Sequence, residues 1–138
     1  MTFVDTNVLI DIVTRDAGWF DWSAGHLSAA LAEGDVLTSA VVTAEMTRGF
    51  ATCADLIATL DRMSVRSIPL DAEPAFLAGK AFASYRSKRD RGEHLRVLPY
   101  FFIGAHAAAL GMPLLTRDRT LYRRYFPDLP LITPETDA

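Results

Sequence analysis

The sequence opens with the stretch from which its fold class can be read, Thr2-Phe3-Val4-Asp5-Thr6-Asn7-Val8-Leu9-Ile10-Asp11. Residues 2–4 favour a buried strand, and apolar side chains then recur at helical spacing over residues 8–12. The polar residues 5–7 are therefore predicted at the carboxyl end of a strand, where parallel α/β sheets place their binding sites. A second interpretation needs no site, because Asp5 or Thr6 can simply cap the following helix.

Length and composition predict one globular α/β domain over residues 1–138. Half of the residues are hydrophobic, which excludes a disordered chain. The single cysteine, Cys53, excludes an internal disulfide and a cysteine-based metal cluster, and fits a reducing cytoplasm. The N-terminus has no basic segment typical of a signal peptide. The uncharged stretch 97–115 is interrupted by prolines and glycines, so we expect a soluble cytoplasmic protein rather than a membrane span.

Short strands alternate with helices along the chain, which predicts a three-layer α/β/α domain with a mostly parallel sheet. Further strands are expected at residues 36–38, 65–71, 113–116 and 129–132, the last at a sheet edge. Helices are expected from a cap at Asp21 to Gly34, over 41–63, from a cap at Asp71 into a basic tail, from Leu98-Pro99 to 110, and around 121–126. The aromatic residues 19, 20 and 22 either fill the core or form an exposed docking patch.

Three acids lie at strand ends or on the helices that follow them: Asp5, Glu45 and Asp118. Carboxylates gathered at one end of a parallel sheet repel each other unless a cation lies between them. Oxygen ligands without clustered histidine or cysteine indicate Mg²⁺ or Mn²⁺, which suits phosphodiester hydrolysis. Each acid alone has an ordinary interpretation, such as a helix cap or, for Glu45, a half-exposed helix former. Together they favour a metal-dependent phosphodiesterase.

The combined pattern resembles a PIN-domain ribonuclease, and specifically a VapC-type toxin of a bacterial toxin–antitoxin pair. The resemblance runs nearly end to end, and its pieces are specific only in combination. They are residues 4–11 with Ala44-Glu45-Met46, Phe102-Ile103-Gly104-Ala105-His106-Ala107, Leu114-Leu115-Thr116-Arg117-Asp118 and Tyr125-Phe126-Pro127, with further matches at Trp19-Phe20-Asp21-Trp22-Ser23 and Phe76-Leu77-Ala78-Gly79-Lys80-Ala81-Phe82.

The resemblance implies that Asp5, Glu45 and Asp118 bind the metal directly or through water. Thr6, Asn7 and Thr116 support them. It implies Mg²⁺-dependent cleavage of RNA, often a structured or transfer RNA, together with a cognate antitoxin and a homodimer. His106 lies among alanines in a predicted helix, and we expect it to be packed in the core with no catalytic role.

Basic residues gather in the second half of the chain. Residues 1–79 hold 4 basic and 11 acidic residues, whereas residues 80–138 hold 10 basic and 6 acidic. This asymmetry is compatible with cations in one place and phosphates in another, or with two ordinary solvated faces. The candidate phosphate contacts also have an alternative, because a helix C-terminus attracts cations. These candidates are Arg86, Lys88, Arg89, Arg91 and Arg117.

The sequence departs from the family pattern at Tyr100, where the family has an aspartate directly after the proline. An aspartate there would favour a helix N-terminus and complete a four-carboxylate site. A neutral phenol is a poor Mg²⁺ ligand, and losing a partner outside the ligand set alone costs roughly 10–100-fold in metal affinity or activity. The toxin is therefore expected to be impaired here.

Two origins of Tyr100 are open: a naturally disabled homologue, or an inactivating substitution selected when a toxin is expressed without its antitoxin. The second is favoured, because Asp to Tyr needs one nucleotide change. The alternative function is a catalytically inactive PIN-fold module that binds antitoxin or RNA. A metal phosphatase or receiver-like domain is disfavoured, since the sequence has no glycine-rich phosphate loop.

Overall fold

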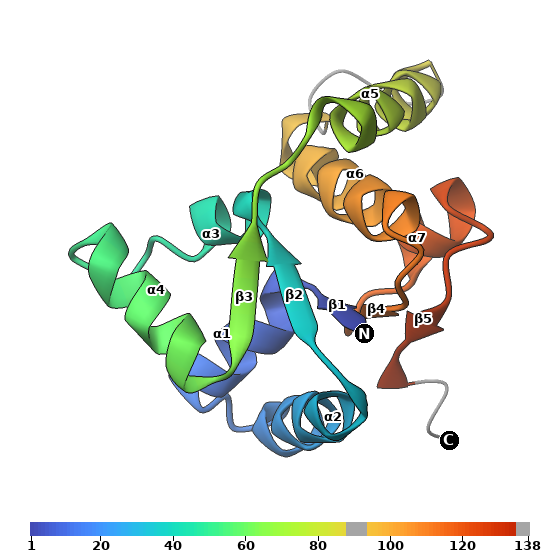
Figure 1. Cartoon of the computed structure of the whole chain (residues 1–138). Coiled ribbons are helices and arrows are strands. Elements are labelled where there is room, and N and C mark those ends of the chain that lie inside the picture. Colours follow the sequence, from blue (N-terminus) through green and yellow to red (C-terminus); the bar gives the residue numbers. More distant parts are fainter. Residues whose placement is uncertain (88–93, 135–138) are drawn as a thin grey trace.

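The computed structural model describes residues 1–87 and 94–134, with the side chains of residues 94–96 left out (Figure 1). Within these residues a five-stranded sheet has the order β3-β2-β1-β4-β5. All its pairings are parallel, so the predicted parallel α/β sheet is confirmed. The strands are β1 (Thr2–Val4), β2 (Val36–Ser39), β3 (Val65–Ile68), β4 (Leu114–Leu115) and β5 (Leu131–Ile132), with β5 at an edge as expected.

Helices cover the sheet in two groups. Figure 1 shows α1, α2 and α4 gathered on one side of the sheet, and α5, α6 and α7 on the other. This is the predicted three-layer arrangement. The described helices are α1 (Thr6–Thr14), α2 (Phe20–Glu33), α3 (Ala40–Glu45), α4 (Cys53–Arg62), α5 (Ala72–Arg86), α6 (His94–Ala109) and α7 (Thr120–Tyr125).

The strand order places a topological switch point between β1 and β4. From β1 the chain moves outward through β2 to β3, and then returns to the other side of β1 to form β4 and β5. In open parallel sheets, ligands bind beyond the carboxyl ends of the strands at such a point. Asp5 follows β1, and residues 116–118 follow β4. The two stretches that the sequence singled out therefore meet at the switch point.

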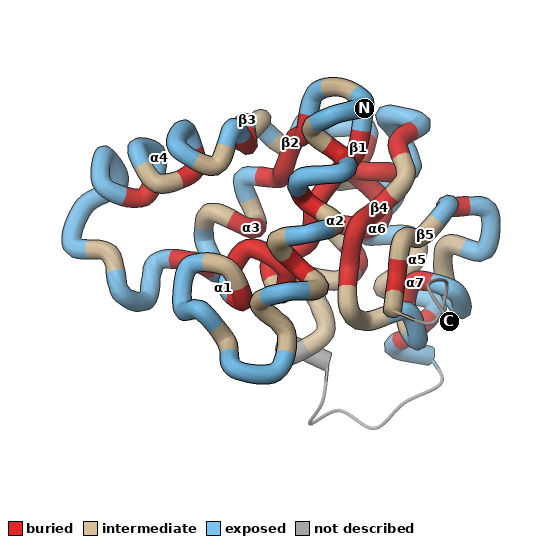
Figure 2. Tube along the Cα trace, turned by 90° about the horizontal axis from the view of Figure 1, so that it is seen from below, coloured by how far each residue is buried: buried red, intermediate tan, exposed pale blue. Residues whose placement is uncertain are grey.

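The core is built on the two central strands. Phe3 and Val4 of β1 and Leu114 and Leu115 of β4 are fully buried. Figure 2 shows buried residues concentrated on β1, β4 and the adjoining α6, with exposed residues on the outer helices. A second cluster joins α5 to α6 and contains Ala78, Tyr85, Phe101 and Ala105. Both strands of the switch point are thus held by a continuous apolar core.

Several predicted boundaries were wrong for local reasons. Asp21 does not cap α2, because the helix starts at Phe20; the Asp16 carboxylate instead accepts hydrogen bonds from the backbone N–H groups of residues 18 and 19. The helix expected over residues 41–63 is two helices, separated by Gly49 with φ +93° and a new cap at Thr52. Strand β3 ends at Ile68, directly before Pro69, which has no N–H for the ladder.

Helix α6 is the largest correction. It begins at His94, so Pro99 lies inside the helix and does not open it. Tyr100 is consequently in the second turn of α6, and the helix-dipole argument for an acid at this position does not apply. The position still faces the switch point, as the pocket described below shows.

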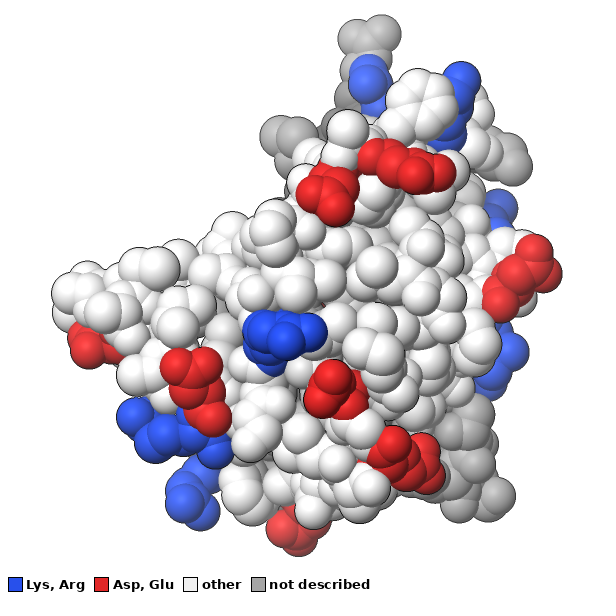
Figure 3. Space-filling model, in the orientation of Figure 1, with Lys and Arg blue, Asp and Glu red and all other residues white. Residues whose placement is uncertain are grey.

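Surface charge and hydropathy add two observations. In the view of Figure 3, acidic and basic side chains are interspersed, so the uneven charge along the sequence does not become a patch of one sign on that face. Among residues 1–87 and 94–134, no helix has both the length and the apolar character needed to cross a bilayer.

Candidate active site

Asp5 is the centre of the site at the end of β1. It is 3% exposed, and its Oδ1 accepts a hydrogen bond of 2.7 Å from the N–H of Thr6, so it also caps α1. Its Oδ2 accepts hydrogen bonds from Thr116 Oγ1 at 2.7 Å and from the Tyr122 hydroxyl at 2.9 Å. A role of Asp5 as a helix cap is therefore compatible with a role in a site, because its two carboxylate oxygens have different partners.

Burial raises the pKa of Asp5 from 3.8 to about 6. Hydrogen bonds from Thr116, Tyr122 and the Thr6 N–H oppose this rise, and the nearby Glu45 carboxylate adds to it. Desolvation is the largest effect, so the folded protein holds a carboxylate that is costly to ionise. Such a perturbed acid at a switch point is typical of a functional site.

Glu45 reaches the same pocket from α3. Its Oε1 accepts a hydrogen bond of 2.6 Å from the Thr6 hydroxyl, which joins it to the residue next to Asp5. A pocket of about 240 Å³ opens here. It is lined by Asp5, Thr6, Asn7, Ile10, Glu45, Pro99, Tyr100 and Ile103.

Asp118 is held by the turn that follows β4. Its backbone N–H donates to Thr116 Oγ1 at 3.1 Å, and the same hydroxyl donates to Asp5. Asn7 links the two strand ends, because its Nδ2 is 3.3 Å from Thr116 Oγ1 and its Oδ1 accepts from the N–H of Arg117 at 3.1 Å. Thr6, Asn7 and Thr116 thus form hydrogen bonds that connect the strand ends and the predicted site residues.

Tyr100 lies among all three acids. Burial raises the pKa of its phenol, and the nearby carboxylates Asp118, Asp5 and Glu45 raise it further, with a side-chain hydrogen bond between Tyr100 and Asp118. The phenol is therefore neutral over the physiological pH range. All three carboxylates are thus near enough to residue 100 to raise the pKa of its side chain, and that side chain is a neutral phenol.

The oxygen ligands at the pocket are of the kind that binds a hydrated divalent cation, but few of them lie close together. Asp5 and Glu45 line one pocket with hydroxyl and amide oxygens, and Mg²⁺ is commonly held by one or two carboxylates with several waters retained. Among the described residues, however, no three acidic, histidine or cysteine side chains are close enough to hold a metal ion together.

Sequence reasoning missed Tyr122, which it counted only as an apolar residue of the short helix. The side chain is fully buried, and its hydroxyl donates to Asp5. A buried tyrosine needs a partner for its hydroxyl, and that requirement was the available signal. Its ring lies 5.5 Å from the ring of Tyr100, so the two tyrosines form one wall beside the acids.

Gly104 on α6 makes room for this wall. A Cβ at this position would lie 2.6 Å and 2.7 Å from Phe126 ring atoms and 3.1 Å from the Tyr122 ring. We expect Gly104→Ala to lower the free energy of unfolding by about 1–3 kcal/mol, because neither packed ring can move freely. Gly79→Ala on exposed α5, where an added Cβ meets nothing within 4 Å, should instead raise it by about 0.5–1 kcal/mol. Urea unfolding of both variants checks this, and equal effects would contradict it.

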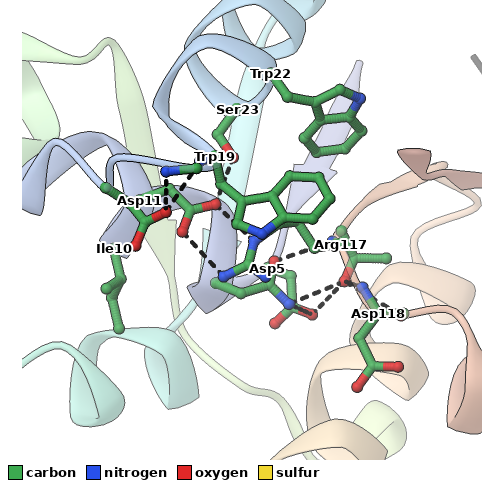
Figure 4. Close-up of polar contacts among 12 residues, drawn as sticks. Asp5, Ile10, Asp11, Trp19, Trp22, Ser23, Arg117 and Asp118 are labelled. Carbon is green, nitrogen blue, oxygen red and sulfur yellow. Dashed lines mark hydrogen bonds and ion pairs between the residues drawn. The ribbon is translucent and has the colours of Figure 1, made fainter.

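The predicted RNA contacts differ in their surroundings. Arg86 is exposed at the end of α5, with its guanidinium 5.9 Å from the Phe82 ring. Lys88, Arg89 and Arg91 lie outside the described residues. Arg117 pairs with Asp11 beneath the Trp19 ring, and Figure 4 shows the Asp118 side chain on the opposite side of this turn.

His106 is 2% exposed and packs against the Phe3 ring at 5.0 Å, as a core residue should. Its Nδ1 has no hydrogen-bond partner, and burial lowers its pKa. It does not line the acidic pocket.

Comparison with known protein families finds that the PIN domain family model matches residues 2–127. The chain belongs to the PIN-domain family. PIN domains are generally nucleases that use divalent metal ions. A search of curated proteins finds no match.

Solved structures share the PIN fold along the whole chain. VapBC2 from Rickettsia felis, bound to a DNA fragment from its promoter, matches with a TM-score of 0.70 and 20% identity, over 96% of this chain and 97% of that one. FitAcB from Neisseria gonorrhoeae matches with a TM-score of 0.67 and 21% identity, over 98% and 99%. DNA-bound VapBC from Salmonella typhimurium matches with a TM-score of 0.64 and 16% identity, over 96% and 98%. At these identities the likeness concerns the fold.

Proposed function

We propose that this PIN domain is an Mg²⁺-dependent endoribonuclease toxin of a VapC-type toxin–antitoxin pair, impaired by Tyr100. One observation carries the proposal: Asp5, Glu45 and Tyr100 line the same pocket at the switch point, and Asp118 is near enough to raise the pKa of the Tyr100 phenol, which supports a role for an acid at position 100. Mn²⁺ is an alternative cation with similar ligand preferences.

The chain's own residues divide the work of holding the site. Asp5 and Glu45 would hold the cation at the pocket, with Asp118 contributing once position 100 is acidic. Thr6 orients Glu45, while Thr116 and Tyr122 orient Asp5. A bound Mg²⁺ supplies charge stabilisation on the phosphate and lowers the pKa of a bound water.

An inactive binding module is the second candidate function. It is favoured by the neutral phenol of Tyr100, which lines the pocket beside Asp5 and Glu45 and is a poor ligand for Mg²⁺. RNA cleavage with Mg²⁺ or Mn²⁺ separates the two proposals. We expect cleavage by the Tyr100→Asp form and little by the unmodified chain, with Tyr100→Asp/Asp118→Asn as the inactive control. No cleavage by Tyr100→Asp would leave the binding module as the better account.

Partners follow from the same proposal. The similar structures are described as VapBC, FitAB and toxin–antitoxin complexes, which supports a cognate antitoxin for this chain. We propose that the antitoxin covers the half-buried aromatic residues 19, 20 and 22, and that the toxin is cytoplasmic.

A homodimer through apolar helix faces is supported by Phe76, 65% exposed, and its neighbour Leu77 on α5. Light scattering of the chain alone tests the homodimer, and light scattering with the antitoxin tests whether the two proteins form a complex.

The basic stretch of residues 86–91 should control RNA affinity rather than chemistry. Neutralising Arg86, Lys88, Arg89 and Arg91 together should weaken RNA binding and flatten its salt dependence, by a slope of roughly 0.7–0.9 for each phosphate that is no longer bound. Single-turnover cleavage of saturating RNA by the Tyr100→Asp form should change much less. Filter binding at several salt concentrations measures the slope. An unchanged slope would mean that these residues are only a solvated helix end.

A further inference from the structure

A partly buried ion pair lies behind the acidic turn and outside the pocket (Figure 4). Arg117 donates from Nε to Asp11 Oδ2 at 2.7 Å and from Nη2 to Asp11 Oδ1 at 3.0 Å. The side chain of Asp11 is 2% exposed and that of Arg117 29% exposed. Ser23 Oγ donates to Asp11 Oδ2 at 2.6 Å, and the Trp19 ring covers the guanidinium at 4.9 Å. The pair is therefore enclosed by α1, α2 and the connection between them.

Residue 117 is attached to α1 at two points. Its backbone N–H donates to Asn7 Oδ1, and its guanidinium reaches Asp11, which follows Asn7 by one helical turn. Residues four apart share a face of a helix, so both attachments lie on the same side of α1. Asp118 is the next residue in the chain, and its side chain lies on the other side of the turn (Figure 4). Two bonds from Arg117 thus fix the peptide that carries the Asp118 carboxylate.

We propose that Asp11 and Arg117 are positioning residues that hold the turn of residues 116–118, and with it the Asp118 carboxylate, against α1. The proposal rests on the proposed function only in taking Asp118 as a residue of the site. It replaces the predicted RNA contact of Arg117, because both arms of the guanidinium that face Asp11 are committed to the pair. Asp11 is buried, so removing the guanidinium of the partly exposed Arg117 would leave an uncompensated charge in the interior and weaken the attachment of the turn to α1.

A phosphate-contact role makes the opposite prediction for Asp11. If Arg117 bound phosphate, Asp11→Asn would free the guanidinium and strengthen RNA binding, and Arg117→Lys would keep the charge and change little. If the pair positions the turn, Asp11→Asn and Arg117→Lys should act alike, because either change removes the charged two-point pairing. Arg117 is a suitable place for this test, since lysine cannot reproduce the guanidinium fork.

Amide hydrogen exchange of the variants, compared with that of the unmodified chain, provides a readout that needs no metal and no activity. In Asp11→Asn and in Arg117→Lys, the amides of residues 117 and 118 should exchange roughly tenfold or more faster. The amides of Phe3 and Asp5, which donate to the carbonyls of Pro113 and Leu115 in the sheet, should change only as far as global stability changes. Asp21→Asn, an exposed aspartate in the first turn of α2, is the matched control and should leave residues 117 and 118 protected.

The apolar replacement Asp11→Leu/Ser23→Ala/Arg117→Met keeps the test decisive if the single variants fail to fold. Replacing a buried pair by apolar residues is often tolerated, so this variant should fold and still lose protection at residues 117 and 118. Full protection there in any folded variant would overturn the proposal. Mn²⁺ titration of Asp11→Asn in the Tyr100→Asp background should show weaker binding than Tyr100→Asp alone. Failure of Tyr100→Asp itself to bind Mn²⁺ would contradict the proposed function while leaving the exchange result intact.

Discussion

Replacing Tyr100 with aspartate is expected to raise the affinity of the site for Mg²⁺ by at least roughly 10–100-fold. The phenol at this position is neutral, because burial and the carboxylates of Asp118, Asp5 and Glu45 raise its pKa above its usual range. Aspartate would add a negative charge beside Asp5 and Glu45 in the pocket and near Asp118. The added charge favours a cation in the pocket.

The same substitution should make stability depend on Mg²⁺. Without metal, the added charge increases repulsion among the acids, so the Tyr100→Asp form should melt below the unmodified chain. At saturating Mg²⁺ each tenfold gain in affinity adds about 1.4 kcal/mol of stabilisation. The difference between the melting temperatures of the Tyr100→Asp form and the unmodified chain should therefore become smaller, or change sign, as Mg²⁺ is added.

Thermal melts with EDTA and with increasing Mg²⁺ measure this effect. Tyr100→Asn is the matched control, because it removes the ring without adding a charge. If Tyr100→Asp responds to Mg²⁺ no more than Tyr100→Asn does, the missing carboxylate is not what limits the site. The site would then have decayed beyond one residue.

The fold was predictable where local signals and the sheet agree. Apolar β1 followed at once by polar residues and a helical pattern placed Asp5 at a strand end, and the structure has it there. The start of α6 was not predictable, because proline normally opens a helix, whereas here it is tolerated inside one. The division of residues 40–62 into two helices was missed because Gly49 was given no role as a helix break.

The acids of the candidate site were proposed from the sequence, whereas part of their hydrogen-bonding surroundings was not. Asp5, Glu45 and Asp118 were proposed together because carboxylates at one end of a parallel sheet repel each other unless a cation lies between them. The bond from Tyr122 to Asp5 spans 117 residues, and the bond from Arg117 to Asp11 spans 106. No local pattern encodes such pairs; only the meeting of β1 and β4 at the switch point brings them together. Arg117 was predicted only as a phosphate contact, and its ion pair with Asp11 was not foreseen.

The free energy of unfolding of metal-free Asp5→Asn, relative to that of the unmodified chain, is expected to rise with pH. Burial raises the pKa of Asp5 to about 6 in the folded protein, against 3.8 for an ordinary aspartate. The folded state therefore binds this proton more tightly than the unfolded state does. Stability from Asp5 is fully present below about pH 3.8 and is lost as the pH rises through about 6, at a total cost of about 3 kcal/mol.

Asparagine removes that cost because it never ionises. Its carbonyl oxygen can keep the hydrogen bond from the Thr6 N–H, while the hydroxyls of Thr116 and Tyr122 must turn to accept from the amide. This rearrangement lowers stability by a similar amount at every pH, whereas the ionisation cost grows with pH. The difference in free energy of unfolding, Asp5→Asn minus unmodified, should therefore increase by up to about 3 kcal/mol between pH 4 and pH 8.

Urea unfolding in EDTA at pH 4, 6 and 8 measures this difference, with Asp61→Asn on the exposed face of α4 as a control for the loss of one aspartate. A difference that stays constant from pH 4 to pH 8 would contradict the prediction. Mg²⁺ adds a second arm in the Tyr100→Asp background. There the cation should stabilise the form that keeps Asp5 and not the Asp5→Asn form, because a charge that is costly in the empty pocket becomes a ligand when the cation is bound. The buried acid would thus reduce the stability of the free protein in order to hold the metal, as expected of a functional residue.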